Sequence, residues 1–440
     1  MEVIDLAGLT AIFEAAGPAL PRIVAAGNHA TPWRLLEAAD KAIPAYRLFQ
    51  VNAQPGVPVR EGVRHESPFV GPGMRGLATL DYLPARLSLV PRILATTHRP
   101  DIVLVHAAPP RGGKLSLGIE VNILPAAMEQ ARDRGGIVVA QINSRMPYTF
   151  GDSQIPLDLV DYAIECDEPL PSPDPRPAGG PEDVAALIGD RIAPMVRDGA
   201  TLQTGIGAVP DAVLAALTGH RGLRIWSEMI SDGVAGLAAS HALDQHHPIT
   251  TSFLFGSPEL YAWADGNRHL WMQRTEVVND PARIATQQAM TSINTALQVD
   301  LYAQANASYA HSRIYSGFGG QTDFIVGALH SLGGQAVIAL PSWHAKTAAS
   351  TIVPQLTTPV TSFQHTAVVT DQGRADLLGC DQRSQADHLI ELAAHPDARE
   401  RLREAARRLG LGSDPAAAQR ESVGSDVGRA GSGPSAHSAG

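Results

Sequence analysis

The sequence predicts an α/β protein with two open, α/β/α-layered domains and mainly parallel sheets. Apolar runs that stop at glycine or proline alternate with amphipathic stretches, which is typical of strands and helices in a parallel sheet. The alternation stops in the Pro- and Gly-rich stretch 168–182 and restarts after it. With 440 residues, the chain is also too long for one ordinary hydrophobic core. We therefore expect domains at residues 1–180 and 181–410.

The first domain is predicted from three continuous apolar runs. Residues 101–110 (DIVLVHAAPP), 135–143 (GGIVVAQIN) and 159–167 (LVDYAIECD) have the composition of strands that are buried on both faces. Between the first two, VNILPAAMEQARDRG has the pattern of a helix that ends at Gly135. Consecutive parallel strands joined in this way require right-handed crossovers.

The second domain repeats the alternation. Strands are expected at 200–207, 223–228, 249–256, 333–342 and 366–373, and helices at 181–199, 209–219, 231–240 and, as a closing pair, within 383–410. Residues 411–440 are rich in Ser, Gly, Ala and Pro and lack apolar periodicity, so they are predicted to be a disordered tail.

Composition excludes several classes of function. The net charge of −10 argues against nucleic acid or an anionic membrane as a partner. No apolar run is long enough to span a bilayer, and the acidic N-terminal stretch does not resemble a signal peptide, so a cytoplasmic location is expected. The two cysteines, Cys166 and Cys380, are expected to be reduced thiols. The histidines are scattered without a metal-binding spacing, so no metal site is predicted.

A glycine turn and an acid suggest two kinds of chemistry. QTGIGAVPDAV (203–213) has the pattern of a strand, a Gly-x-Gly turn and a helix start, which favours an anionic ligand. Glu228 follows 23 residues after Gly205, near the spacing of an acid that binds the ribose of a nicotinamide cofactor. Against this interpretation, Pro210 stands where the third glycine of that motif belongs.

The alternative interpretation makes Glu228 a nucleophile. A carboxylate at the end of a strand, in a partly dry site, can attack a thioester carbonyl if nearby amides stabilise the oxyanion. GFGGQTDF (317–324) offers such amides at Gly319 and Gly320, although a plain glycine hairpin would have the same sequence.

Many segments, in unbroken order, resemble the acetyl-CoA hydrolase/transferase family, which includes 4-hydroxybutyrate and acetate CoA-transferases. The resemblance covers about residues 50–405 and rests on NAQPGVP (52–58), SPFVGPGMR (67–75), PPRGGKLSLG (109–118), NSRMPYTFGDSQIP (143–156), LQTGIGAVPDAVLAAL (202–217), SEMISDG (227–233), NTALQVDLYAQAN (294–306), GFGGQTDF and VVTDQGRADLLG (368–379). It implies a homodimer of two-domain chains with the active site between the halves. It also implies coenzyme A as part of the substrate, a small carboxylate as acceptor, and no metal or organic cofactor.

The resemblance assigns roles to individual residues. SEMISDG carries the family's catalytic glutamate, which becomes Glu228, and the implied reaction passes through a glutamyl-CoA thioester on that residue. Gly320 matches the oxyanion-hole amide and Asn279 an asparagine that orders the site. The residues expected at CoA are Gly205, Ile206, Gly207, Ala208, Val209, Ala303 and Lys346, and those expected at the substrate are Asp371 and Gln321.

Four departures from the family pattern lie near these positions. Asp371 replaces a glutamate, Val326 and Thr351 each replace an arginine, and Ala303 stands where a glycine is usual. The loss of two cations would weaken the binding of a phosphate or carboxylate. A homologue that binds CoA or a partner without turnover therefore stays open as an alternative, as does hydrolysis of the acyl-CoA.

Overall fold

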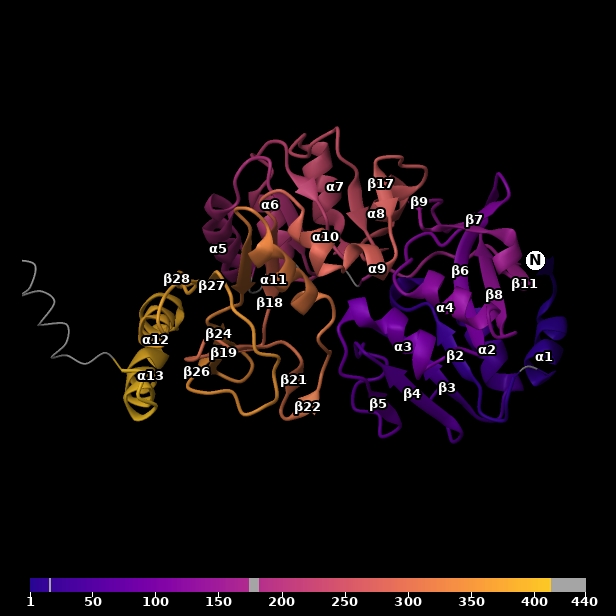
Figure 1. The fold of residues 1–440 in the computed structure, drawn as a ribbon, viewed down its shortest axis with the longest axis horizontal. Coiled ribbons are helices and arrows are strands. Elements are labelled where there is room, and N and C mark those ends of the chain that lie inside the picture. The colour runs from indigo at the N-terminus through magenta and orange to yellow at the C-terminus, as the bar shows by residue number, and fades with distance from the viewer. Residues whose placement is uncertain (16, 174–181, 413–440) are drawn as a thin grey trace, which may run out of the picture.

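The computed structural model describes residues 1–15, 17–173 and 182–412, and its two main sheets confirm the predicted fold class. The larger sheet is built from residues 2–166 and the smaller from residues 201–376, at opposite sides of the molecule (Figure 1). Most of the predicted linker (168–182) and of the predicted tail (411–440) lies outside the described residues.

The larger sheet has eight parallel strands along its main path. Their order is β1 (Glu2–Val3), β11 (Tyr162–Cys166), β8 (Ile137–Asn143), β6 (Ile102–Arg111), β2 (Arg22–Ala25), β3 (Tyr46–Phe49), β4 (Val63–Ser67) and β5 (Leu80–Tyr82). Strands β7 (Lys114–Ser116) and β10 (Gln154–Pro156) extend it in the antiparallel sense. The three strands predicted for this half are β6, β8 and β11, whereas β2 to β5 were not predicted.

Helices cover both faces of this sheet. Successive side chains of a strand point to opposite faces, so neighbouring residues of one strand pack against different helices. Ile23 and Ala25 of β2 belong to the hydrophobic cluster of α1 (Leu6–Ala15) and α2 (Trp33–Ala42). The intervening Val24 belongs to the cluster of α3 (Val90–Thr96) and α4 (Leu124–Arg132). One continuous apolar run thus fills two cores.

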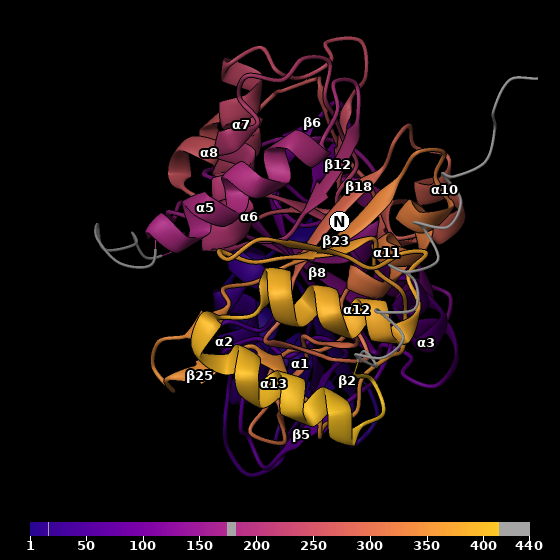
Figure 2. The ribbon, with the colours of Figure 1, turned by 90° about the vertical axis from the view of Figure 1, so that its left-hand side faces the viewer.

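The smaller sheet has the order β13 (Arg224–Ile225), β12 (Thr201–Thr204), β18 (Thr291–Thr295), β23 (Gln335–Ala339), β27 (Ala367–Val369) and β28 (Arg374–Asp376), of which only β28 is antiparallel. One face packs against α5 (Glu182–Ile192) and α6 (Ala208–Ala216), with α7 (Asp232–Ala239) beside α6. The other face is covered by α11 (Gln321–His330), α12 (Gln382–His388) and α13 (Pro396–Arg408). Figure 2 shows α12 and α13 side by side at the end remote from the larger sheet.

Short strands and helices complete the described structure, most of them in the second half. The small sheets are β14 (Met229–Ile230) with β16 (Phe253–Leu254); β15 (Ile249–Thr251), β17 (Leu270–Met272) and β9 (Phe150–Gly151); β19 (Gln298–Asp300), β20 (Ala305–Asn306) and β26 (Ile352–Val353); β21 (Tyr309–Ala310) with β22 (Arg313–Ile314); and β24 (Trp343–His344) with β25 (Ala349–Ser350). The remaining helices are α8 (Pro258–Ala264), α9 (Thr275–Val278) and α10 (Pro281–Ala285). Because β9 comes from the first half and β17 from the second, their pairing ties the halves together.

Two of the predicted strands differ from the structure. The strand expected at 249–256 is two short strands, β15 and β16, which lie in small sheets and not in the main one. The strand expected at 223–228 ends at Ile225, so that Glu228 lies in the loop before β14. Of the helices within the described parts of the chain, none is long and apolar enough to cross a membrane.

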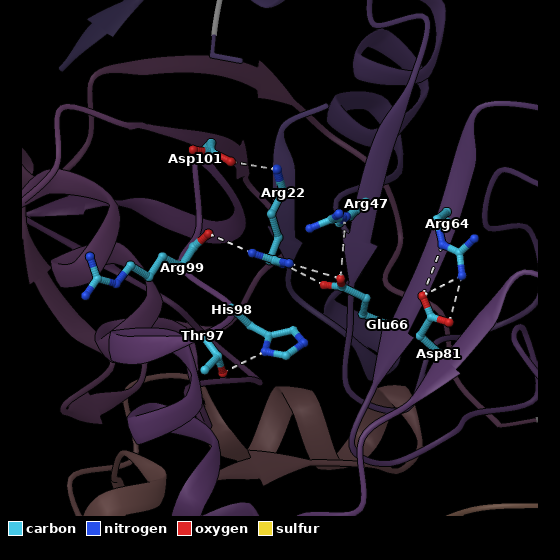
Figure 3. Close-up of polar contacts among 9 residues, drawn as sticks. All are labelled: Arg22, Arg47, Arg64, Glu66, Asp81, Thr97, His98, Arg99 and Asp101. Carbon is cyan, nitrogen blue, oxygen red and sulfur yellow. Dashed lines mark hydrogen bonds and ion pairs between the residues drawn. The ribbon is translucent and has the colours of Figure 1, made fainter. Parts of the chain in front are cut away.

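A cluster of charged side chains lies on strands β2 to β5 (Figure 3). Arg22 donates from Nε to Glu66 Oε2 at 2.6 Å and from Nη2 to Glu66 Oε1 at 3.1 Å, and both side chains are buried. The Arg22 backbone N–H also donates to Asp101 Oδ2 at 2.8 Å. These bonds fix the start of β2 against its neighbours.

Candidate active site

Glu228 occupies the short loop between β13 and β14, and its backbone is firmly held. Its carbonyl oxygen accepts hydrogen bonds from the N–H groups of Ser252, at 2.8 Å, and Phe253, at 3.1 Å. The Thr251 hydroxyl donates to the same oxygen at 3.2 Å. The half-buried side chain is thereby directed from a fixed point into a cavity.

Asn279 and Gly320 meet the carboxylate of Glu228. Asn279 donates from Nδ2 to Glu228 Oε2 at 2.9 Å, and the Gly320 backbone N–H also donates to this carboxylate. A Cβ atom at position 320 would lie 1.7 Å from Glu228 Oε2 and 2.4 Å from Asn279 Nδ2, so only glycine fits. The structure therefore brings together all three residues that were expected to be catalytic.

The cavity around Glu228 has a volume of about 210 Å³ and is lined by both halves of the chain. Its wall is formed by Val51, Asn52, Phe69, Gln203, Thr204, Gly205, Ile206, Glu228, Met229, Phe253, Asn294, Thr295, Ala307, and residues 316–321. Among these lining residues Glu228 is the sole charged side chain, and none is Lys, Arg or His. A partly apolar cavity with few polar groups is typical of a small-molecule site.

The surroundings of Glu228 disfavour its charge. Burial raises the pKa of its carboxyl to about 7, with the negative charges of Asp323 and Glu120 adding to the effect and the hydrogen bonds from Asn279 and Gly320 opposing it. Near neutral pH, the side chain is therefore divided between its neutral form and the nucleophilic carboxylate.

Asp323 connects this site to the first half of the chain. It lies in the first turn of α11, fully buried, and accepts hydrogen bonds from the Ser88 hydroxyl at 2.7 Å and the Ser88 N–H at 3.2 Å. Burial raises the pKa of Asp323 to about 6, which hydrogen bonds from Ser88, the Arg86 charge and Asn279 oppose. Asp323 belongs to the GFGGQTDF segment, whose sequence alone does not indicate this role.

A second polar group that sequence reasoning missed is Glu120 with two asparagines. Glu120 is buried and accepts hydrogen bonds from the Gly27 N–H at 3.3 Å and from Asn28 Nδ2 at 2.7 Å. Asn52 donates from Nδ2 to Asn28 Oδ1 at 2.6 Å. Burial raises the pKa of Glu120 to about 7, against the hydrogen bonds from Asn28 and Gly27. The one sequence signal was the NAQPGVP segment, which begins at Asn52.

The residues of the glycine turn, 205–209, do not all line the same cavity. Gly205 and Ile206 line the cavity that holds Glu228. Ile206 and Gly207 also line a neighbouring cavity of about 900 Å³, and Gly207 has a φ of 125° that favours glycine. Ala208 begins α6, and Val209 is buried in the hydrophobic core.

The remaining expected site residues do not all reach the cavity. Gln321 lines it. The buried Nε2 atom of Gln321 donates to no acceptor in the described structure. Ala303 is buried in the hydrophobic cluster of β19 and β26, with a φ of 58°, and Lys346 is exposed between β24 and β25. Neither residue is part of the cavity wall.

Two of the departures from the family pattern, Asp371 and Thr351, have local hydrogen-bond partners. Asp371 accepts hydrogen bonds from the Ser342 N–H at 2.6 Å and the Ser342 hydroxyl at 2.9 Å, which help to keep its pKa low against the effect of burial. Thr351 donates to the Pro341 carbonyl at 2.6 Å. Asp371 and Thr351 thus brace the 341–342 turn, and, like Val326, they do not line the cavity of Glu228.

A metal centre would require several ligating side chains in one place. Within residues 1–15, 17–173 and 182–412, no three His, Cys, Asp or Glu residues are arranged to hold a metal ion. The groups available at Glu228 are a carboxylate, backbone amides and neutral side chains, which suits attack on an acyl carbonyl.

Comparison with known proteins identifies the family. The model of the acetyl-CoA hydrolase/transferase N-terminal domain matches residues 57–172, and the model of the C-terminal domain matches residues 256–406. The 4-hydroxybutyrate coenzyme A transferase of Clostridium kluyveri is 37% identical over 84% of this chain and 88% of its own length.

Solved structures give the same result. The crystal structure of RipA from Yersinia pestis superimposes with a TM-score of 0.83 at 27% identity, covering 93% of this chain and all of that chain. The 4-hydroxybutyrate CoA-transferase of Porphyromonas gingivalis has a TM-score of 0.77 at 30% identity, over 92% of this chain and 97% of that one. The chain therefore belongs to the acetyl-CoA hydrolase/transferase family of enzymes.

Proposed function

We propose that this enzyme is a CoA-transferase that moves CoA from a short acyl-CoA to a carboxylate through a thioester on Glu228. The observation that carries the proposal is the contact of the Glu228 carboxylate with the Gly320 amide and Asn279 in a cavity without another charged side chain. The relatives support transfer more than hydrolysis. The Clostridium kluyveri transferase is matched over 88% of its length, whereas the Kluyveromyces lactis acetyl-CoA hydrolase is 30% identical over 57% of its length.

In the first half of the reaction, a Glu228 oxygen attacks the thioester carbonyl, and the carbon–sulfur bond breaks. The products are a mixed anhydride on Glu228 and the CoA thiolate, which carries away the electron pair. The thiolate then attacks the glutamyl carbonyl carbon, releasing the first acyl group as a carboxylate and leaving a glutamyl-CoA thioester. The second carboxylate accepts CoA by the reverse of these steps.

The surrounding residues have distinct parts in these steps. The Gly320 N–H and Asn279 Nδ2, which contact the carboxylate in the free enzyme, stabilise the oxyanion that develops on the glutamyl group. The fixed carbonyl of Glu228 keeps the nucleophile in one orientation. Water excluded by the bound acyl chain cannot hydrolyse the anhydride or the thioester.

The proposal is tested by trapping the covalent intermediate. The protein is incubated with acetyl-CoA or butyryl-CoA, treated with borohydride or hydroxylamine, digested, and mapped by mass spectrometry, with Glu228→Gln as the control. We expect a modification at Glu228 in the wild type and none in the variant. An unmodified Glu228 across a panel of short acyl-CoAs would contradict the mechanism.

Exchange kinetics separate the remaining alternatives. Acyl-CoA is mixed with acetate, and product CoA esters are followed with and without the acceptor. Transfer requires the acceptor, whereas hydrolysis releases free CoA without it. A protein that is stabilised against heat by CoA but gives neither product would be a binding homologue without turnover. The homodimeric state and the cytoplasmic location expected from the sequence stay predictions; ultracentrifugation measures the former.

A further inference from the structure

The segment 316–320, which supplies the backbone amide of the candidate site, is held in place by the first half of the chain. It follows β22 in the second half, and two of its carbonyl groups accept hydrogen bonds from the first half. The Val70 N–H donates to the Ser316 carbonyl at 2.8 Å, and the Leu87 N–H donates to the Gly319 carbonyl at 3.1 Å. Both bonds connect parts of the chain that are more than two hundred residues apart in the sequence.

The bond from Leu87 acts on the same peptide group that contacts Glu228. The Gly319 carbonyl and the Gly320 N–H belong to one planar trans peptide unit and point in opposite directions. A donor that holds the carbonyl therefore also fixes the direction of the N–H, which donates to the Glu228 carboxylate. A hydrogen bond at the carbonyl polarises the peptide as well, and so strengthens its N–H as a donor.

The next residue of the same turn, Leu87–Leu89, bonds to α11. Ser88 donates from its hydroxyl to Asp323 Oδ1 at 2.7 Å and from its N–H to Asp323 Oδ2 at 3.2 Å. Asp323 also accepts a hydrogen bond from Asn279, which is the second donor to Glu228. The turn leads into α3, on the side of the first half that faces the second (Figure 1). One short turn is thus connected to both donors of the nucleophile.

The partners of Asp323 indicate what this buried carboxylate does. Burial of a carboxylate is unfavourable unless hydrogen bonds and charges compensate it. Its ion pair with Arg86 is long, at 3.9 Å, and 39% of the Arg86 side chain is exposed, so this pair contributes little. The close contacts are the two bonds from Ser88 and the one from Asn279. Asp323 therefore connects the turn to the asparagine of the site.

We propose that the turn Leu87–Leu89 positions both hydrogen-bond donors of Glu228, with Ser88 and Asp323 as positioning residues. Neither of these two side chains lines the cavity. The first half of the chain thereby sets the catalytic geometry of the second. The proposal rests on the proposed function, because it takes the two donors to stabilise the reacting glutamyl group.

Ser88→Ala tests the hydroxyl bond. The kcat for CoA exchange between butyryl-CoA and acetate should fall about tenfold without an increase in the KM for butyryl-CoA, because misplaced donors slow the chemistry while the substrate does not touch Ser88. Ser144→Ala is the matched control, since it breaks an exposed hydrogen bond of 2.8 Å to Asp167 and should leave both constants unchanged. A loss confined to KM would overturn the positioning role of Ser88.

A double-mutant cycle tests whether Ser88 acts through Asp323. Asp323→Asn leaves one acceptor oxygen for three donors, and kcat should fall about tenfold to a hundredfold. The double variant should match Asp323→Asn within about twofold, because both changes break one connection. Effects that multiply would overturn the route through Asp323. Asp167→Asn, at an exposed position, is the control and should keep the wild-type kcat.

Hydrogen exchange gives a measure that does not depend on turnover. Mass spectrometry of the full chain should show faster amide exchange in residues 316–324 of Ser88→Ala than in the wild type or in Ser144→Ala. Loss of structure in Asp323→Asn would raise exchange over the whole chain, and Ser88→Ala, at a partly exposed position, then decides the question.

The outcomes separate this proposal from the transferase mechanism. An adduct at Glu228 together with a wild-type kcat in Ser88→Ala and Asp323→Asn overturns the positioning role and leaves the transferase mechanism intact. The absence of an adduct with every acyl-CoA overturns the transferase mechanism. In that case unchanged exchange of residues 316–324 in Ser88→Ala overturns the positioning role as well, whereas faster exchange supports it.

Discussion

Two glutamates of this chain, Glu66 and Glu228, have opposite electrostatic environments. Glu66 is paired with the Arg22 guanidinium at 2.6 Å within the charged cluster of Figure 3, where Asp81 is likewise paired with Arg64 at 2.8 Å. Glu228 faces an asparagine amide and a backbone N–H, and its nearest charged neighbours include the acids Glu120 and Asp323. The first environment stabilises a charge; the second keeps a carboxylate reactive at a cost in stability.

Removal of the Glu228 carboxylate is expected to have the largest effect, which is a loss of catalysis. Glu228→Gln keeps the shape and removes the nucleophile, so the rate of CoA exchange should fall about 10⁴-fold or more. Because the charge is poorly compensated, the variant should unfold at a temperature equal to or higher than that of the wild type. Glu400→Gln, at an exposed position of α13, is the control for both measurements. Undiminished exchange in Glu228→Gln would refute the nucleophilic role.

The matching change in the charged cluster should affect stability. Glu66→Gln leaves the buried Arg22 guanidinium without its counter-charge, and we expect a loss of about 3–5 kcal/mol in the free energy of unfolding. Asp81→Asn, which breaks an exposed pair, should cost less than about 1 kcal/mol. Urea denaturation measures both. Equal effects of the two substitutions would mean that burial does not distinguish the pairs.

Gly320→Ala tests the amide that contacts Glu228. Its methyl group would need the space of the Glu228 carboxylate, since a Cβ there lies 1.7 Å from Oε2. Displacement of the carboxylate and of the oxyanion donor should lower kcat about 10²- to 10³-fold. Gly236→Ala in α7 is the matched control, because its Cβ would have no atom within 4 Å, and it should leave kcat unchanged.

The smallest expected effect is a pH dependence. The pKa of Glu228 is raised to about 7, and only its ionised form attacks. The kcat/KM should therefore rise about tenfold per pH unit below pH 7 and level off above it. By linkage, Glu228 favours the folded state most below its unfolded pKa of about 4.5, and this contribution is lost as the pH rises through 7. A rate that is flat between pH 5 and 8 would contradict the raised pKa.

Sequence reasoning predicted those parts of the molecule that depend on local pattern. Apolar runs identified β6, β8 and β11 because both faces of these strands are buried. Strand β3 (YRLF) and strand β4 (VRHES) were not predicted, because charged side chains interrupt their apolar character. The charges belong to the cluster around Arg22 and Glu66, which forms only when the strands are adjacent.

The residues of the candidate site also divide into those that a local motif predicts and those whose role depends on the fold. Glu228, Asn279 and Gly320 were named from short motifs, and the fold brings them into contact although they are separated by up to 92 residues. Glu120 and Asn28 had no comparable signal, since their role depends on one hydrogen bond between segments of the first half. The turn contact of Asp371 with Ser342 likewise depends on how two loops pack, which no sequence spacing specifies.

The chemical state of Glu228 is expected to affect the hydrogen bonding at the N-terminus of α11. Gly320 is its N-cap, and the N–H of this residue donates to the Glu228 carboxylate. When Glu228 carries CoA as a thioester, it loses its negative charge and becomes a weaker acceptor. Amide hydrogen exchange at the start of α11 should then be faster in the enzyme that carries CoA on Glu228 than in the free enzyme.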